Sequence, residues 1–359
     1  MTREELSQAL GQIDTMYIEE VLHTRKKRPR WPLLAAACLV LVCLGTALVQ
    51  TEPRDLPAEE TLPMLSAQLL QEGMGFEGVM VYDVAELSQS NPWTPETQLE
   101  TLPVYRNLAY TDGAGAPAWL SDREMLALAK ETARKMNAAI TAKTWEPAQE
   151  GDRSYSLTAQ TDRGTIRVSG NGWITAEFAA PWTLEAAQAL AGCRVDASWT
   201  DYSFAGEPFP HREAWKGGEA QTEAILRYNF SRATFAQDEA GKVWMMGWGD
   251  LLGSAEKLGD YGILSLEEAR DLLLAGDCLT SVPEEYGGVT REAIGKEELV
   301  YVTGNANEVF QPYYKFWVEL TDPPGEMAEG LKTYGAYYVP AVSPIYLTDF
   351  PSETTSVFQ

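Results

Sequence analysis

The sequence predicts an α+β protein in which one N-terminal transmembrane helix precedes an ectodomain of helices packed on antiparallel sheets. One observation is the segment 31–49, which contains no charged residue and at helical rise spans about 28 Å, close to the ~30 Å hydrocarbon core of a bilayer. The other is the alternation, after residue 120, of helix-capping patterns with strand-like segments that turn residues separate.

Basic residues stand directly before the apolar segment and set its predicted orientation. They are Arg25, Lys26, Lys27, Arg28 and Arg30. Because basic flanks stay on the cytoplasmic side, residues 1–30 are predicted to be cytoplasmic and 31–49 to span the bacterial cell membrane once, as a signal anchor. The bulk of the chain would then be extracytoplasmic. A cleaved signal peptide and a lipid anchor at Cys38 or Cys43 are the alternatives.

Charge divides sharply along the 359-residue chain. Residues 1–30 carry a net charge of +1, whereas residues 50–359 hold 22 Lys and Arg against 47 Asp and Glu, a net of −25. This acidic surface argues against nucleic acid as a partner, because nucleic-acid binding needs a basic footprint. The length of the acidic part suggests two domains.

Residues 2–24 are predicted to form an amphipathic cytoplasmic helix, which opens with the capping-box pattern Thr2 to Glu5. An apolar stripe follows at helical spacing: Leu6, Leu10, Ile13, Tyr17 and Val21. So short a segment cannot bury this stripe in a core of its own, which makes it a candidate docking face for a cytoplasmic protein. The alternative is a helix that lies on the inner membrane leaflet.

Proline content and turn residues assign the next segments. Residues 50–103 are predicted to form an acidic, Pro-rich stalk and an irregular lead-in, with a short strand at 79–82. Residues 104–182 are the first predicted α+β unit, in which a helix starts at the Ser121 capping box. Three alternating segments then predict an antiparallel meander: 154–160, 165–169 and 173–178.

Residues 183–346 are predicted to form one or more further α+β units, before a polar tail at 347–359. Two short helices, at 183–191 and 265–275, each begin with a Ser or Thr cap and end at a glycine. Their similarity indicates either an internal repeat or convergent capping. The predicted strands of this region are 224–233, 242–247, 298–303, 309–320 and 334–342.

The chain carries little recognisable catalytic chemistry. His23 and His211 are its only histidines, and His211 is interpreted as a loop residue. No nucleophile–histidine set, metal-binding motif or glycine-rich phosphate loop is present in the sequence, which predicts a protein that is no enzyme and needs no cofactor or metal. Cys193 and Cys278 either form a disulfide or are two buried, unpaired thiols.

Two stretches of the sequence resemble known protein families. The N-terminal stretch resembles that of uncharacterised single-pass membrane proteins of clostridial Firmicutes, some of which are anti-sigma-like. Its matching segments, ahead of the basic cluster, are Thr2-Arg3-Glu4-Glu5-Leu6, Gly11-Gln12-Ile13-Asp14 and Tyr17-Ile18-Glu19-Glu20. Residues 261–346 resemble PepSY-like and YycI-type extracytoplasmic modules. Their matching segments are Ser265-x-Glu267-Glu268-Ala269, Leu299-Val300-Tyr301, Pro312-Tyr313-Tyr314-Lys315-Phe316 and Tyr334-Gly335-Ala336-Tyr337-Tyr338-Val339-Pro340.

The resemblance implies an ectodomain of PepSY/YycI-like repeats and, since YycI-type proteins regulate a membrane sensor kinase, a regulatory role. Together these observations predict a membrane-anchored, non-enzymatic regulatory or sensory protein. Its ectodomain would bind a protein or peptide, and its cytoplasmic helix would dock a sigma factor or a sensor kinase. One alternative is an extracytoplasmic binding or protease-inhibitor module that the span merely tethers. Another is a cell-wall hydrolase with two carboxylates in a cleft.

Overall fold

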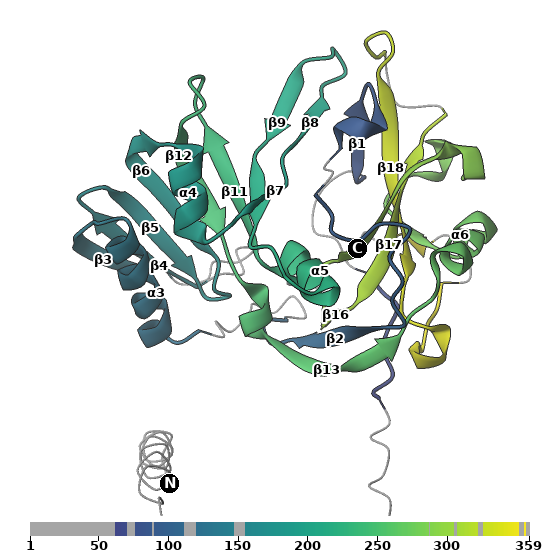
Figure 1. Cartoon of the computed structure of the whole chain (residues 1–359), viewed down its shortest axis with the longest axis horizontal. Coiled ribbons are helices and arrows are strands. Elements are labelled where there is room, and N and C mark those ends of the chain that lie inside the picture. The colour runs from purple at the N-terminus through teal and green to yellow at the C-terminus, as the bar shows by residue number, and fades with distance from the viewer. Residues whose placement is uncertain are drawn as a thin grey trace, which may run out of the picture. The chain divides into compact units, whose positions relative to one another are not determined.

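Antiparallel strands are the main regular structure of the computed structural model, whose elements are labelled in Figure 1. The structure describes residues 62–69, 76–87, 90–110, 120–146, 155–286, 288–304, 307–321, 326–351 and 355–356. These residues belong to one unit that begins at Leu62. The predicted cytoplasmic helix, the basic cluster and the apolar segment 31–49 lie outside the described residues.

The predicted fold class is wrong. The described residues form only four α-helices, of 8 to 14 residues, against the strands of four sheets. No helix in this part of the chain is long and apolar enough to cross a membrane. The transmembrane helix predicted at 31–49 falls on residues that the structure does not describe, so the described fold lends it no support. The unit is mainly β structure because buried side chains recur at every second position along many of its segments.

The largest sheet, called the large sheet below, has eight antiparallel strands. In spatial order they are β3 (Ile140–Glu146), β4 (Ser156–Thr161), β5 (Gly164–Ser169), β6 (Ile174–Trp182), β12 (Val243–Trp248), β11 (Arg232–Gln237), β10 (Glu213–Trp215) and β7 (Val195–Asp196). Helices α3 (Asp122–Lys135) and α4 (Leu184–Ala191) pack on the sheet and enclose the first hydrophobic core with it (Figure 1). The meander predicted from the Asn171-Gly172 turn is confirmed as β4, β5 and β6.

Local sequence explains both helices of this layer. At α3, the Ser121 hydroxyl accepts the Glu124 backbone N–H while the Glu124 carboxylate accepts the Ser121 N–H, so the predicted capping box is confirmed. One face of α3, with Met125, Ala129 and Ala133, is buried on the sheet. Helix α4 ends at Gly192, whose positive φ of 72° glycine adopts without strain.

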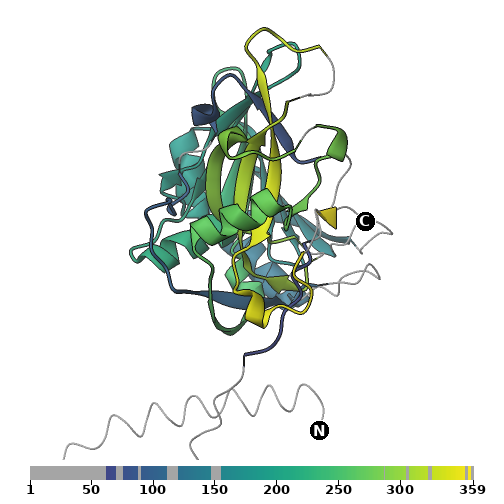
Figure 2. The ribbon, with the colours of Figure 1, turned by 90° about the vertical axis from the view of Figure 1, so that its right-hand side faces the viewer.

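The second sheet, called the C-terminal sheet below, has six strands. The path runs through β15 (Ile294–Tyr301), β17 (Pro312–Glu319), β18 (Lys332–Pro340), β14 (Leu279–Thr280) and β19 (Thr355–Ser356), and β1 (Gly78–Val81) also pairs with β18. Helix α6 (Leu266–Ala275) contacts β18, and Figure 2 shows it lying across this sheet. Aromatic side chains of β17 and β18 fill the second core.

A small sheet, a hairpin and a helix complete the described unit. A small sheet consists of β13 (Ala255–Gly262), β2 (Thr101–Asn107) and β16 (Val309–Phe310). The strands β8 (Trp199–Tyr202) and β9 (Pro208–His211) form a separate hairpin, and α5 (Gln221–Phe230) precedes β11. Figure 1 shows the hairpin standing between the large sheet and β1.

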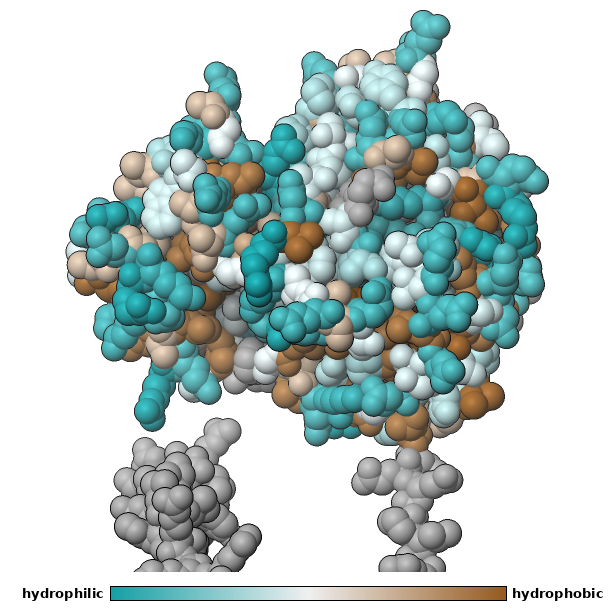
Figure 3. Space-filling model, viewed as in Figure 1, coloured by the Kyte–Doolittle hydropathy of each residue, from teal (hydrophilic) through white to brown (hydrophobic). Residues whose placement is uncertain are grey.

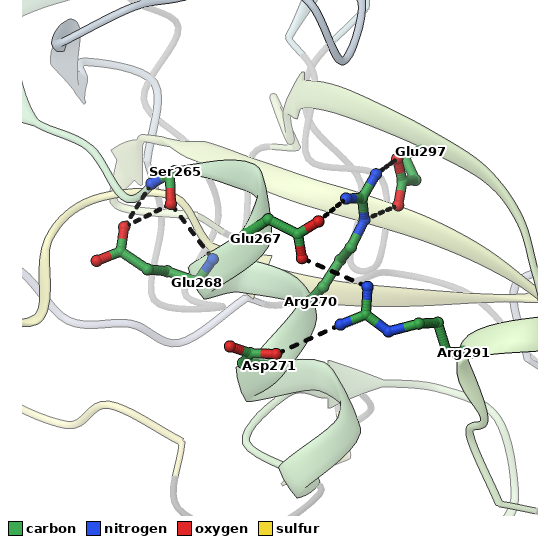
Figure 4. Close-up of polar contacts among 7 residues, drawn as sticks. All are labelled: Ser265, Glu267, Glu268, Arg270, Asp271, Arg291 and Glu297. Atoms are coloured by element: carbon green, nitrogen blue, oxygen red, sulfur yellow. Dashed lines mark hydrogen bonds and ion pairs between the residues drawn. The ribbon is translucent and has the colours of Figure 1, made fainter.

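An ion-pair network holds α6 to the C-terminal sheet (Figure 4). The Arg270 guanidinium donates to both carboxylate oxygens of Glu297 on β15, with 2.6 Å between Nη2 and Oε2, and also to Glu267 one turn earlier. Arg291 extends the network to Glu267 and Asp271. The Arg270 and Glu297 side chains are only 21% and 12% exposed, so this pair is shielded from solvent.

Two boundaries differ from the predicted domain limits. From residue 62 onward the predicted stalk and lead-in belong to the folded unit, where Leu65, Ala67 and Leu69 are buried and β1 pairs with β18. The boundary predicted between residues 182 and 183 runs through the large sheet, because β6 pairs with β12. Both differences arise from strand pairs between segments that are distant in sequence, which local patterns do not reveal.

The strand predicted at 224–233 is also wrong. Residues 221–230 form helix α5, and only from Arg232 does the chain enter a strand. The buried residues Ala224, Ile225 and Tyr228 have helical spacing and form one face of this helix. A short apolar run fits both periodicities, and packing against β15 and β11 decides the outcome here.

Gly164→Ala should destabilise the protein by about 2–4 kcal/mol, because Gly164 has a φ of +139° and an added Cβ would clash with the Glu177 carbonyl oxygen. Gly241→Ala is the matched control, since Gly241 also has a positive φ, +71°, but nothing lies within 4 Å of its added Cβ. Gly241→Ala should lower the free energy of unfolding by about 1 kcal/mol. Urea unfolding followed by circular dichroism measures both, and equal losses would contradict the clash.

Candidate functional site

A pocket of about 320 Å³ lies between the β8–β9 hairpin and the C-terminal sheet, and is called the inter-sheet pocket below. Its lining combines aromatic, charged and apolar side chains: Glu77, Val79, Leu87, Trp199, Asp201, His211, Tyr228, Arg232, Lys296, Glu298, Lys315 and Trp317. Elsewhere, on the face shown in Figure 3, hydrophobic side chains form separate patches among hydrophilic ones. Pockets between packed layers are common places for ligand binding, which makes this one the candidate site.

Strand β17 supplies one wall. Lys315 and Trp317 are two residues apart and therefore point to the same face of the strand. The Lys315 ammonium lies 2.6 Å from Glu77 Oε1 and 3.9 Å from the centroid of the Trp317 ring. Glu77 also accepts a hydrogen bond of 2.5 Å from the Tyr338 hydroxyl. The ammonium is thus held by a carboxylate and an aromatic face at once.

A second charge pair lies beside the first, on β15. Glu298 is opposite Lys315 in the strand register, and Lys296 is opposite Trp317. The Lys296 ammonium is 3.3 Å from Glu298 Oε1, and Trp317 Nε1 donates to Glu298 Oε2 over 2.9 Å. Both oxygens of this carboxylate, which is only 7% exposed, are therefore engaged. Such bonds to the ionised form offset the free-energy cost of burying the charge.

The hairpin forms the opposite wall. Trp199 and His211 face each other across β8 and β9, and their rings stack with centroids 4.7 Å apart and planes 11° apart. His211 Nε2 lies 3.1 Å from Asp201 Oδ1. His211 is therefore part of a strand and of the pocket lining, whereas its sequence context predicted an ordinary loop residue.

Contacts between the hairpin and its surroundings hold this wall in place. The Tyr202 hydroxyl donates to Glu86 over 3.0 Å, and the Tyr202 ring meets the Tyr82 ring edge-on at 4.8 Å. The Phe204 carbonyl accepts the backbone N–H of Ala328. These contacts join the hairpin to the elements around the C-terminal sheet.

Arg232 closes the end of the pocket near the large sheet. Its guanidinium lies 5.0 Å from the Tyr228 ring centroid and 6.0 Å from that of Trp199, and it is paired with Glu213. Burial raises the pKa of Glu213 above its ordinary value, and the charges of Arg232 and His211 act in the opposite direction. The pair fixes the orientation of the guanidinium, which keeps Arg232 at the pocket.

The pocket is suited to binding by charge pairing and apolar contact. Glu77 and Glu298 each face a lysine ammonium and each accept a second hydrogen bond, so both carboxylates are held in the pocket wall. Within the described ranges, no group of three or more His, Cys, Asp or Glu side chains is placed to hold a metal ion.

Of the predicted site residues, the structure describes only the two cysteines. The candidate docking face and the topology determinants lie outside the described residues. The candidate disulfide between Cys193 and Cys278 is not formed, because the first thiol is buried in the core of the large sheet and the second in that of the C-terminal sheet. Burial raises the pKa of the Cys193 thiol to about 11, although Lys216 counteracts this, so little of it is thiolate at neutral pH.

Sequence reasoning missed the whole pocket, although a local signal exists. Three pairs of lining residues are two positions apart on one strand: Trp199 and Asp201, Lys296 and Glu298, and Lys315 and Trp317. Charged or aromatic side chains at alternate positions mark one face of a strand as polar yet rich in aromatics. The sequence does not say that these three faces meet, because that depends on strand pairing over long range.

Comparison of the chain with family models, with curated proteins and with solved structures finds no match. The resemblance to clostridial single-pass proteins and to PepSY-like and YycI-type modules therefore stays a prediction.

Proposed function

We propose that this protein is a non-enzymatic regulatory or sensory protein whose folded unit binds a peptide or protein segment in the inter-sheet pocket. The observation that carries the proposal is the pocket itself, in which aromatic rings and oppositely charged side chains from two separate walls converge. Pockets of this kind bind by shape, apolar contact and a few placed charges. A peptide can supply apolar side chains and charged groups of both signs in a defined shape.

The rival function, a cell-wall hydrolase, needs two carboxylates with distinct protonation states flanking the bond to be cleaved. The inter-sheet pocket contains Glu77, Asp201 and Glu298, but each lies against a cationic or titratable partner: Lys315, His211 and Lys296. Each of these carboxylates is thus engaged by a protein side chain, whereas a hydrolase needs two that are available to the substrate. Binding is therefore the function that this arrangement supports best.

The remaining parts of the predicted function rest on sequence alone. Location in the bacterial cell membrane and docking of a sigma factor or sensor kinase by the face Leu6 to Val21 depend on residues outside the described part of the chain. Deletion of residues 2–24 tests the docking role. If every phenotype of the full chain survives the deletion, the tethered binding module replaces the regulatory protein as the better proposal.

Lys315→Met should weaken peptide binding by at least about 10-fold, because it removes the ammonium that holds Glu77 and the Trp317 ring in position in the pocket wall. Peptides are first selected on the wild-type full chain from a displayed random library, and their affinities are then measured for each variant. Lys332→Met is the matched control on the neighbouring strand, since its pair with Glu319 is 47% and 40% exposed and lies away from the pocket lining.

Trp199→Leu provides a second test on the other wall, in case Lys315→Met does not fold, and circular dichroism verifies the fold of each variant. Loss of binding in either pocket variant, with the Lys332→Met affinity unchanged, supports the proposal. Peptides that bind both pocket variants as tightly as the wild type would remove the pocket as the binding site. If the protein releases cleaved products from cell-wall fragments, the hydrolase becomes the better proposal.

A further inference from the structure

We infer that the ligand of the inter-sheet pocket is a zwitterionic amino acid or short peptide, recognised through both its free carboxylate and its free ammonium group. This inference rests on the proposed function and narrows it from peptides in general to one chemical class. Four features of the pocket support it: the balance of charges, the hydrogen-bonding capacity that remains, the covered aromatic faces and the volume.

Charges of both signs line the pocket in equal number. The cations are Arg232, Lys296 and Lys315, and the anions are Glu77, Asp201 and Glu298. Each wall carries both signs, since the C-terminal sheet has two lysines and two glutamates and the opposite wall has Arg232 and Asp201. A purely anionic ligand such as phosphate would meet three carboxylates, and a purely cationic ligand would meet three cations. A ligand with both charges satisfies the lining best.

Two of these residues keep capacity for a ligand. A guanidinium has five N–H donors, and among the described residues the hydrogen bond and ion pair of Arg232 go to Glu213. Asp201 uses Oδ1 for His211, and within the same ranges no hydrogen bond reaches its Oδ2. Their side chains are 29% and 26% exposed, so both are accessible from the pocket. Arg232 is placed to receive a carboxylate, and Asp201 to receive an ammonium group.

The aromatic faces argue against a sugar. Neutral carbohydrate rings stack on open aromatic faces, but one face of Trp199 is covered by the parallel His211 ring and the Trp317 ring by the Lys315 ammonium. The same covering leaves little room for a quaternary ammonium cage, because protein cations already occupy the ring faces. The rings instead hold the charged side chains in position.

The pocket volume sets an upper limit on the ligand. At about 320 Å³ it lies at the lower end of the range typical of small-ligand pockets. Val79 and Leu87 add an apolar surface for one side chain of the ligand. A free amino acid or a short peptide fits this space, whereas a long strand or a folded domain would extend beyond it.

The experiment titrates the full chain with a mixed library of dipeptides that have free termini, and follows intrinsic tryptophan fluorescence and ligand-observed NMR. The same library is tested after N-acetylation and, separately, after C-terminal amidation. We expect each blocking group to weaken binding at least about 10-fold. Inorganic phosphate and N-acetylglucosamine serve as probes of the rejected ligand classes and should give no saturation.

Variants assign each end of the ligand to one residue. In Arg232→Gln, amidation should no longer lower the affinity for the dipeptide, whereas acetylation still should. In Asp201→Asn, acetylation should no longer lower the affinity, whereas amidation still should. If Arg232→Gln fails to fold, Arg232→Lys replaces it: lysine keeps a cation beside Glu213 but lacks the two-pronged guanidinium, so the loss of affinity on amidation should become smaller without disappearing. Arg212→Gln is the control, because Arg212 bonds Gln237 and does not line this pocket. It should leave both affinity losses as in the wild type.

The outcomes separate this inference from the proposed function. Two results together support the inference. Dipeptides bind only when both termini are free, and the affinity loss caused by amidation disappears in Arg232→Gln while that caused by acetylation disappears in Asp201→Asn. Blocked peptides that bind as well as free ones, in a manner sensitive to Lys315→Met, would overturn the zwitterion and leave the peptide-binding function standing. Saturable binding of phosphate or N-acetylglucosamine alone, or no binding of any peptide, would overturn both.

Discussion

Phe316→Ala should lower the free energy of unfolding by about 3–5 kcal/mol, the largest loss expected of any single substitution considered for this protein. Phe316 is 0% exposed and lies in β17, between β15 and β18 in the C-terminal sheet. Its ring packs in the second core, and truncation would remove apolar contacts and leave a cavity that the two flanking strands cannot close.

Phe209→Ala is the control for this prediction. Phe209 lies on β9 and is 52% exposed, so the same change of side chain removes little buried surface. Its effect should stay within about 0.5 kcal/mol. Urea denaturation at neutral pH, analysed with a common slope, measures both variants. A similar midpoint for the two would mean that Phe316 is not packed as the structure has it.

Arg270→Met should destabilise the protein by about 2–4 kcal/mol, because it removes the guanidinium that pairs with both oxygens of Glu297. Methionine keeps most of the side-chain length, so the loss reports chiefly on the charge pair. The Glu297 side chain is 12% exposed, and water can compensate it only in part. The variant should also loosen α6, which hydrogen exchange of the α6 amides would detect.

Arg134→Met is a close control for this second prediction. Arg134 also donates to both oxygens of a glutamate, Glu131, but the two side chains are 72% and 46% exposed. Solvent screening should leave the unfolding midpoint of Arg134→Met close to that of the wild type. If the two variants lose the same stability, then the shielding of the Arg270–Glu297 pair contributes nothing. Adding Glu297→Gln to Arg270→Met should recover part of the loss, since it removes the buried charge.

Several elements were predictable from the sequence because their causes are local. The caps at Ser121, Thr183 and Ser265 place the starts of α3, α4 and α6 correctly, and the glycines that follow the last two helices place their ends. The helix predicted from Ser121 to about Ile140 is too long, because α3 ends at Lys135 and Ile140 begins β3. The Asn171-Gly172 turn likewise predicts the meander of β4 to β6. Each of these signals acts over only a few residues, so it is fully contained in a short stretch of sequence.

Other elements could not be assigned this way. The residues of α5 read as a strand because a short apolar run fits two periodicities, and the choice comes from packing against β15. The small sheet was missed because β2 and β13 are about 150 residues apart and pair only in the folded chain. The acidic, Pro-rich composition before residue 103 concealed a segment whose leucines enter the core.

Short-range interactions determine what the sequence alone predicts, and long-range contacts determine what only the tertiary structure shows. Sequence patterns were sufficient for helix caps, turns, strand alternation and the acidic character of the chain, all of which arise between near neighbours or from composition. The fold class and the inter-sheet pocket required tertiary structure. Glu77 and Lys315, which form one of its charge pairs, are 238 positions apart, and only strand pairing and hairpin packing bring them together.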